Sequence, residues 1–169
     1  MTSKPVLEQS EGPQSVITDE MRAAIDKEGE PSILEVDKTG CRMFARAVGH
    51  TDLIFYDEQY AKSKGYRSIV APPGFMGTRT FAPSAGSAAP RAPGMGFSVP
   101  YKRVLNGGTE IEYHDSICAG DVLEARNKIS GFNERSGSMG PMLITSRETT
   151  FRNKDGKVVA IERGQVIQY

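Results

Sequence analysis

The last third of the chain constrains the fold most, because apolar and polar residues alternate there along successive segments. Alternation with a period of two is typical of strands that bury one face, and it runs through residues 109–117, 123–132, 142–153 and 157–169. Asn153-Lys154-Asp155-Gly156 predicts a hairpin turn, since Asp-Gly tolerates the positive φ of tight turns. A turn is also expected at 119–121 and a polar connection at 133–141. Long strands joined by short turns indicate a curled antiparallel sheet rather than a βαβ fold.

The N-terminal half carries helical patterns instead. Residues 1–17 are polar and predict a flexible arm, so the domain itself is expected over 18–169. Four apolar residues recur at i, i+3, i+4 and i+7 and therefore share one face of a helix that Gly49 ends: Cys41, Phe44, Ala45 and Val48. Short helices are also expected at 18–29 and 57–65, and a strand at 32–37. The simplest α+β solution wraps the sheet round one helix and pairs its other face, or its edge, with a second subunit.

Charge and hydropathy narrow the classes of partner. The chain has 169 residues, which suits one domain, and its 21 basic and 21 acidic side chains cancel, so nucleic acid is not an expected partner. No apolar run approaches the roughly 20 residues of a membrane span, and no signal peptide is recognisable, so we expect a cytoplasmic protein. Cys41 and Cys118 stand far apart with no histidine at metal-ligand spacing, which predicts two reduced, buried thiols and no metal site.

One long segment breaks this pattern. Residues 71–108 are dense in Pro, Gly, Ala and Ser, and a connection of that length inside a compact domain is uncommon. Such a loop is often functional, but a lid or an arm that clasps a second subunit fits the composition equally well.

Three stretches resemble the MaoC-like family of hot-dog-fold hydratases and dehydratases that act on acyl thioesters. They are FARAVGHTDLIFYDEQYAKSKGYRSIVAPPGF at 44–75, GGTEIEYHDSICAGDVLEARNKI at 107–129 and GPMLITSRETTFRNKDGKVVAIERG at 140–164. The chain is most similar to the N-terminal-type, or fatty-acid-synthase-like, dehydratase domain. The resemblance implies a single hot-dog fold, with an antiparallel sheet wrapped around a central helix and a sheet-to-sheet dimer.

The resemblance also implies where the chemistry of the family would reside. Active members carry Gly-Asp-x-Asn-Pro-Ile-His-x-Asp, in which the Asp and His share the proton transfers that accompany addition of water to a trans-2-enoyl thioester. Here Gly49, Ile54 and Asp57 match that motif, whereas four positions depart from it. His50 occupies the position of the catalytic Asp and Phe55 that of the catalytic His. Asp52 and Leu53 occupy the positions of the Asn and the Pro. An Ala-His-Gly stretch of active members is replaced by Ala71-Pro72-Pro73-Gly74.

Loss of the acid–base pair favours a subunit that binds the acyl thioester and leaves proton transfer to a partner. In the family, degenerate hot-dog units pair with intact ones and line the tunnel for the acyl chain. The resemblance therefore implies a substrate-binding role for Phe55, Pro73, Gly74, Phe75 and Met76. The substrate would be carried on coenzyme A or an acyl-carrier protein, with no metal or redox cofactor. Cations after the motif could meet its phosphates: Lys62, Lys64, Arg67, Arg79 and Arg91.

Two other hypotheses remain open from the residues. A stand-alone homodimeric hydratase would use a relocated catalytic pair, His50 and Asp52, which are separated by one residue and could meet in a turn. A non-enzymatic module would bind acyl-CoA without turnover. The second histidine, His114, shares a strand face with Glu110 and Glu112 and is expected to be solvated or to face a dimer partner.

Overall fold

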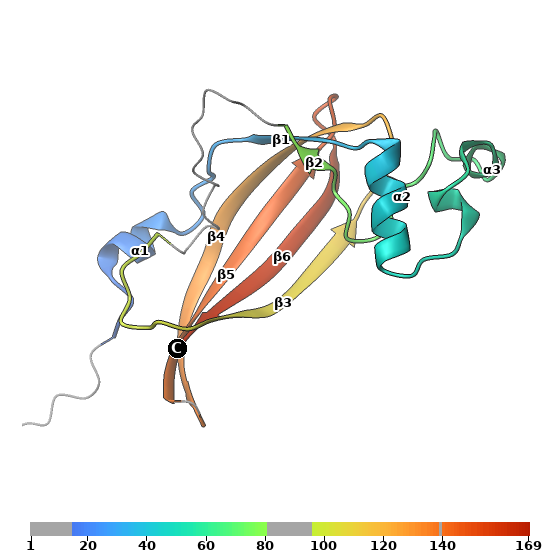
Figure 1. The fold of residues 1–169 in the computed structure, drawn as a ribbon. Coiled ribbons are helices and arrows are strands. Elements are labelled where there is room, and N and C mark those ends of the chain that lie inside the picture. Colours follow the sequence, from blue (N-terminus) through green and yellow to red (C-terminus); the bar gives the residue numbers. More distant parts are fainter. Residues whose placement is uncertain (1–14, 81–95, 139) are drawn as a thin grey trace, which may run out of the picture.

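A six-stranded antiparallel sheet dominates the computed structural model, which describes residues 15–80, 96–138 and 140–169. Its strand order is β2-β1-β4-β5-β6-β3 (Figure 1). The strands are β1 (Ser32–Glu35), β2 (Thr78–Arg79), β3 (Val104–Tyr113), β4 (Val122–Gly137), β5 (Gly140–Arg152) and β6 (Val158–Gln168). The helices are α1 (Asp19–Ala24), α2 (Lys38–Ala47), the 3₁₀ turn η1 (Leu53–Phe55) and α3 (Glu58–Ser63). The predicted curled antiparallel sheet is therefore confirmed.

The hairpins of the last third follow the predicted order but reach further. Gly156 has a φ of 78°, and the Asn153 Oδ1 accepts hydrogen bonds from the N–H groups of Asp155 and Lys157, both at 3.0 Å, which confirms the predicted turn. The prediction of a polar connection at 133–141 is wrong, because β4 and β5 continue to pair as far as Gly137 and Gly140. In a two-stranded ribbon the backbone N–H and C=O groups form hydrogen bonds across the pair. A segment of exposed polar residues can therefore remain in strand conformation without a buried face.

Two of the three predicted helices end where their glycines predict. Asp37 caps α2 and Asp57 caps α3, each accepting a backbone N–H three residues on, at 2.8 and 3.0 Å. Gly49 and Gly65 follow the two helices with φ values of 77° and 91°, the left-handed conformation that ends a helix at least cost when the residue is glycine. The first helix is shorter than the predicted 18–29, because the Gly29 N–H donates to the Asn127 carbonyl of β4 at 2.8 Å and draws the chain onto the sheet.

A short backbone seam joins the helical half of the chain to the sheet. The Ala71 N–H donates to the Ile117 carbonyl and the Ala119 N–H to the Ile69 carbonyl, both at 2.8 Å. One residue beyond the seam, the Gly120 N–H donates to the Val36 carbonyl at 2.7 Å, which ties the β1–α2 connection to the same place. We call the paired segments 69–71 and 117–119 the seam.

The core lies where α2 and the seam meet the sheet. Cys41 of α2 is fully buried in one cluster with Leu123, Phe151 and Ala160 of the strands. Figure 1 shows α2 beside the end of β3, with the curled sheet extending away from it. Cys41 and Cys118 are both free and buried, as predicted, and burial raises the pKa of the Cys41 thiol to about 11. The sheet-to-sheet dimer and the boundary between arm and domain at residue 18 stay predictions. Within the described ranges, no helix combines the length and apolarity needed to cross a membrane.

We predict that Gly49→Ala lowers the free energy of unfolding by about 1 kcal/mol. A Cβ at this position would meet no atom within 4 Å, so the loss comes only from the positive φ of 77°. Urea unfolding followed by circular dichroism would measure it. Gly131→Ala is the matched control, since Gly131 also has open space around it but no positive φ, and it should change stability by less than about 0.5 kcal/mol. Equal effects of the two substitutions would contradict this account of the helix end.

Candidate functional site

The loop 49–57 is held by the ends of two helices. The His50 N–H donates to the Ala45 carbonyl of α2 at 2.9 Å, which fixes the start of the loop directly behind Gly49. Asp52 caps η1 by accepting the Ile54 N–H at 3.0 Å, and Asp57 caps α3. Both acidic side chains in this stretch therefore have structural hydrogen bonds, and the Val70 N–H, which donates to the Ile54 carbonyl at 3.0 Å, ties the loop to the seam as well.

His50 lies against Phe55 rather than Asp52. The two rings are 5.2 Å apart between centroids and tilted by 39°, and Phe55 is 8% exposed. Among the described residues no hydrogen bond or ion pair joins His50 to Asp52, whose side chain is exposed and turned to the backbone of η1. The Tyr56 hydroxyl donates to the His50 carbonyl at 2.5 Å and fixes that residue further. A catalytic pair made of His50 and Asp52 stays a prediction.

A cleft of about 550 Å³ opens beside Phe55. Its walls come from three segments: η1, the stretch around the seam that includes Pro73, and the chain that follows β3. It is lined by Ile54, Phe55, Val70, Ala71, Pro73, Tyr113, His114, Asp115, Ser116 and Ile117. The lining is mainly apolar with a few polar groups, which is the usual character of a small-molecule site.

The other three residues predicted to bind substrate lie next to the cleft but do not line it. Phe75 packs on Phe44 of α2, with ring centroids 5.6 Å apart, and Met76 is 8% exposed within the core. Gly74 has a φ of 92°, which lets the chain turn back towards the sheet and form β2. Their role in substrate binding stays a prediction.

Tyr113 supplies a contact that sequence reasoning did not find. Its hydroxyl accepts the Gly74 N–H at 2.7 Å, so the last residue of β3 ties down the 71–76 segment at the cleft. Burial raises the pKa of the Tyr113 hydroxyl. The hydrogen bond from the Gly74 N–H lowers this pKa and the nearby Glu162 carboxylate raises it, and the net shift is upward. Alternation placed Tyr113 and His114 on opposite faces of a strand, but the strand ends at Tyr113 and both residues line the cleft.

His114 is close to one carboxylate. Its Nε2 lies 3.7 Å from the Glu112 Oε1, an ion pair only when the imidazole is protonated. The pKa of the Glu112 carboxyl is lowered, mainly because the Arg163 guanidinium donates to it at 2.9 Å. The charge of His114 lowers this pKa further. His114 is therefore a partly exposed residue of the cleft wall rather than one that faces only solvent.

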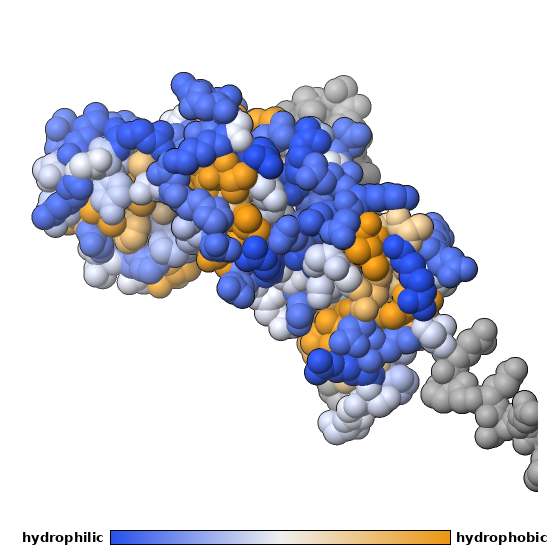
Figure 2. Space-filling view, turned by 180° about the vertical axis from the view of Figure 1, so that it is seen from behind, coloured by the Kyte–Doolittle hydropathy of each residue, from blue (hydrophilic) through white to orange (hydrophobic). Residues whose placement is uncertain are grey.

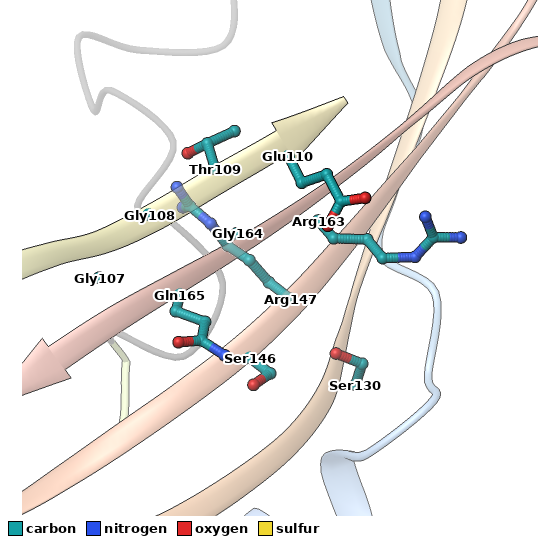
Figure 3. A pocket seen from close by; sticks show the side chains of 10 residues that line it. All are labelled: Gly107, Gly108, Thr109, Glu110, Ser130, Ser146, Arg147, Arg163, Gly164 and Gln165. Carbon is teal, nitrogen blue, oxygen red and sulfur yellow. The ribbon is translucent and has the colours of Figure 1, made fainter. Parts of the chain in front are cut away.

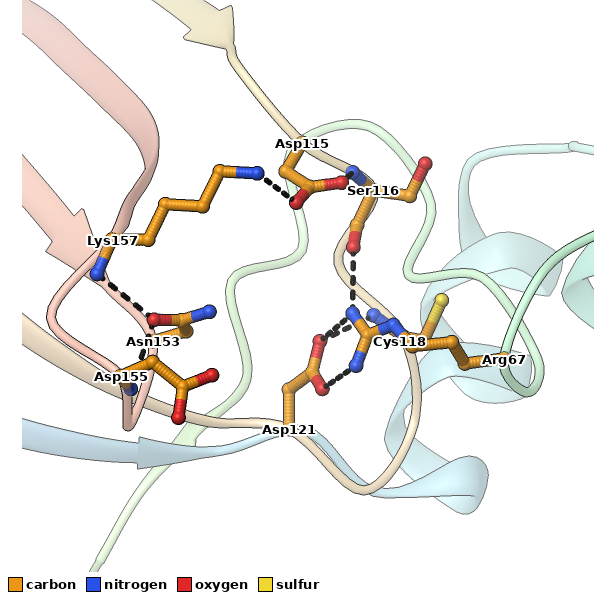
Figure 4. Close-up of polar contacts among 8 residues, drawn as sticks. All are labelled: Arg67, Asp115, Ser116, Cys118, Asp121, Asn153, Asp155 and Lys157. Carbon is orange, nitrogen blue, oxygen red and sulfur yellow. Dashed lines mark hydrogen bonds and ion pairs between the residues drawn. The ribbon is translucent and has the colours of Figure 1, made fainter.

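A clamp of charged groups holds the far wall of the cleft (Figure 4). Arg67 donates to both oxygens of Asp121, at 2.6 and 2.9 Å, and to the Ser116 carbonyl at 3.0 Å. The same Asp121 carboxylate accepts the Cys118 N–H at 2.9 Å, and nearby Lys157 donates to Asp115 at 2.6 Å. Arg67, one of the cations that could meet phosphate, organises the turn at 116–121.

The other candidate cations are placed as follows. Lys62 pairs with Glu58 at 3.0 Å, and Lys64 lies over the Tyr60 ring, 5.2 Å from its centroid. Arg79 is exposed on β2, and Arg91 lies outside the described residues. Hydrogen bonds from Lys38, which links α2 to α3, and from Lys62 lower the pKa of Glu58 to about 2.

A second hollow, of about 470 Å³, lies over the sheet between β3 and β4 (Figure 3). Glycine, serine and charged residues line it: Gly107, Gly108, Thr109, Glu110, Ser130, Ser146, Arg147, Arg163, Gly164 and Gln165. Arg163 is paired with Glu112 and Glu148, at 2.9 and 3.1 Å. None of the lining residues belongs to the 49–57 loop or the 71–76 segment, so we assign the candidate site to the first cleft.

The part of the chain that the structure describes holds no group of three or more His, Cys, Asp or Glu side chains placed to bind a metal ion. The cleft offers hydrogen-bonding groups and apolar surface, from Tyr113 and His114 on one side and Phe55 and Pro73 on the other.

Comparison with known proteins extends the likeness over both halves of the chain. The family model described as "FAS1-like, dehydratase domain region" matches residues 23–162. A UPF0336 protein of Parafrankia sp. (strain EAN1pec) is 32% identical over 126 residues, or 75% of this chain and 78% of that protein. The "Probable enoyl-CoA hydratase alpha subunit" of Thermomonospora curvata is 23% identical over 137 residues, or 76% of this chain and 43% of that protein.

A solved structure shares the fold. The C-terminally truncated HadBC (3R-hydroxyacyl-ACP dehydratase) complex of Mycobacterium tuberculosis gives a TM-score of 0.62 at 23% identity, over 85% of this chain and 98% of that chain. This likeness confirms the hot-dog fold that the sequence resemblance implies.

We predict that Asp121→Ala lowers the free energy of unfolding by about 2 kcal/mol, because it leaves the Cys118 N–H without its acceptor in a buried position. Thermal and urea unfolding would both report it. Asp155→Ala is the control, since the Asp155 carboxylate has no hydrogen bond or ion pair among the described residues, and it should stay within about 0.5 kcal/mol of wild type. A neutral Asp121→Ala would show that the clamp does not hold the wall.

We also predict a pH-dependent contribution from Glu58. Its pKa falls from 4.5 to about 2 on folding, so its stabilising effect is complete above about pH 4.5 and disappears as the pH falls towards 2. Glu58→Gln should therefore lower the melting temperature at pH 7, and the difference from wild type should vanish near pH 2. Differential scanning fluorimetry across this range would measure it. Glu20→Gln, at an exposed residue outside this network, should show no comparable change with pH.

Proposed function

Because the chain belongs to the family of the FAS1-like dehydratase domain region, we propose that it is an acyl-thioester-binding subunit of an enoyl-CoA hydratase or (3R)-hydroxyacyl-thioester dehydratase. In this proposal a MaoC-like partner subunit supplies the acid and the base. The chain itself binds and encloses the acyl group in the cleft beside Phe55.

The position of Phe55 carries the proposal. Addition of water across the double bond needs one group that removes a proton from water and one that delivers a proton to C2. Phe55 can do neither, and its buried ring occupies the cleft wall at the end of η1. Asp52 is turned to the backbone of η1, so the loop offers an apolar wall where the chemistry of the family needs a proton carrier.

The lining of the cleft suits an acyl group. Ile54, Val70, Ala71 and Ile117 surround Phe55 with aliphatic surface. Burial of such surface contributes about 25 cal/mol per Å², so even a short acyl chain would gain affinity there. The carrier would be coenzyme A or an acyl-carrier protein, and neither a metal nor a redox cofactor is required, since hydration involves only proton transfer and addition.

The free edge of β3 supports a partner of the same fold. Among the described strands, β3 pairs only with β6, so one side of its backbone is open along residues 104–113. Val104 and Leu105 on it are 47% and 43% exposed, and Figure 2 shows hydrophobic patches among the hydrophilic surface. An open strand edge binds another strand through backbone hydrogen bonds. The structurally similar HadBC assembly is a complex, and another relative is named an alpha subunit, which supports a heterodimer.

The main alternative is a stand-alone homodimeric hydratase that uses His50 with Asp52. The observation in its favour is the place of His50 directly beside Phe55, which lines the cleft, with ring centroids 5.2 Å apart. A non-enzymatic acyl-CoA-binding module is a second alternative. Both alternatives use the same cleft as the main proposal. They differ from it or from each other in whether the chain alone, or the chain with a partner, turns over the substrate.

We predict that the purified chain alone does not hydrate enoyl-CoA thioesters of four to sixteen carbons, because the cleft lacks a proton carrier at Phe55. The measurement is loss of enoyl absorbance, with native mass determined on the same sample. Co-purification from the source cell should recover a MaoC-like protein that retains the motif Asp and His, and the pair should be active.

The alternatives predict other results in the same assay. Turnover by the chain alone at an ordinary enzymatic rate, abolished by His50→Ala and by Asp52→Asn, would establish the homodimeric enzyme and contradict our proposal. Binding of acyl-CoA without turnover, in the presence and absence of every co-purified protein, would establish the non-enzymatic module.

A further inference from the structure

The hydroxyl of Tyr113 is a polar group of the cleft wall whose proton has no acceptor among the described residues. It accepts the Gly74 N–H at 2.7 Å, and Tyr113 is 42% exposed and lines the cleft. A tyrosine hydroxyl has one proton to donate besides the lone pairs that accept. With one lone pair occupied by Gly74, the O–H is left to donate to a ligand.

The Gly74 N–H strengthens this donor. Hydrogen bonds in a chain polarise one another, so a hydroxyl that accepts from a backbone N–H donates more strongly through its own proton. The Phe75–Phe44 contact, with ring centroids 5.6 Å apart, keeps the segment that carries this N–H in place. The orientation of the hydroxyl is therefore set by the backbone and not by the ligand.

The negative charge of Glu162 near Tyr113 favours a neutral ligand oxygen over an anionic one. Burial raises the pKa of this hydroxyl, so at neutral pH it is protonated and is a donor. The Glu162 carboxylate acts on the same hydroxyl and disfavours negative charge beside it. A neutral carbonyl oxygen satisfies the proton without meeting this repulsion, whereas a carboxylate or phosphate oxygen would meet it.

We propose that Tyr113 binds the carbonyl oxygen of an acyl thioester, with its O–H as the donor and the Gly74 N–H as the group that orients it. This inference rests on the proposed function and adds a residue to it, because the aliphatic lining of the cleft holds the acyl chain but cannot orient the carbonyl. Tyr113 is thereby the residue that distinguishes a thioester from a ligand with the same chain and no carbonyl.

The test compares two ligands that differ only in the carbonyl. Butyryl-CoA is the thioester, and S-butyl-CoA is the matching thioether. Affinities for both would be measured by isothermal titration calorimetry with the full chain in the oligomeric state in which it purifies. Wild type should bind butyryl-CoA about 3- to 10-fold more tightly than S-butyl-CoA, the range expected for one hydrogen bond.

Tyr113→Phe keeps the ring and removes the hydroxyl, so it should abolish this preference. The quantity compared is the ratio of the two affinities within each protein, because loss of the Gly74 tether acts on both ligands alike. Tyr101→Phe is the matched control, since Tyr101 lines a different hollow, next to Pro100 and Met142, and it should keep the wild-type preference. A second measurement follows the bond itself. The carbonyl stretch of [1-¹³C]butyryl-CoA should move to lower frequency on binding to wild type and not on binding to Tyr113→Phe.

The outcomes separate this inference from the proposed function. If wild type and Tyr113→Phe both bind the two ligands with the same preference, or if the carbonyl stretch shifts equally in both, Tyr113 only tethers the 71–76 segment and the inference is overturned while the proposed function stands. If wild type binds neither ligand, the proposed function fails and the inference fails with it.

Discussion

The seam between 69–71 and 117–119 is the contact on which the rest of the structure depends. Two backbone hydrogen bonds of 2.8 Å join the helical half to the sheet half at the seam, beside the separate pairing of β1 with β4. The Arg67–Asp121 clamp holds one end of the seam and Tyr113 holds the other, through Gly74. Because Val70, Ala71 and Ile117 also form the cleft wall, the contact that closes the core is the contact that shapes the site.

The loop 49–57 combines a defined backbone conformation with an apolar side chain at the cleft. Gly49 ends α2 and Asp57 caps α3, so the loop is presented to the cleft in a fixed conformation. At the position that faces the cleft, however, the chain has the buried ring of Phe55. A loop with an apolar tip suits the binding of an acyl chain, which is the role that we propose for it.

The sequence predicts well what depends on neighbours along the chain. The glycines after α2 and α3 and the Asn153–Gly156 turn are local, and all are found as expected. It predicts poorly what depends on distant partners. Gly74 and Tyr113 are 39 residues apart and Arg67 and Asp121 are 54 apart, and no periodicity reports such pairs. The first helix was overestimated for the same reason, since Gly29 is drawn away by Asn127 of a distant strand.

The open side of β3 has a consequence for how the protein is handled in the cell. Backbone groups that no described strand covers can pair with a strand of another molecule, including the same strand of another copy. Synthesis in excess of whatever covers this strand would leave copies that associate with one another and precipitate. If the partner subunit that we propose covers this strand, the soluble amount of the chain would depend on the supply of that partner, and balanced production of the two would serve solubility as well as activity.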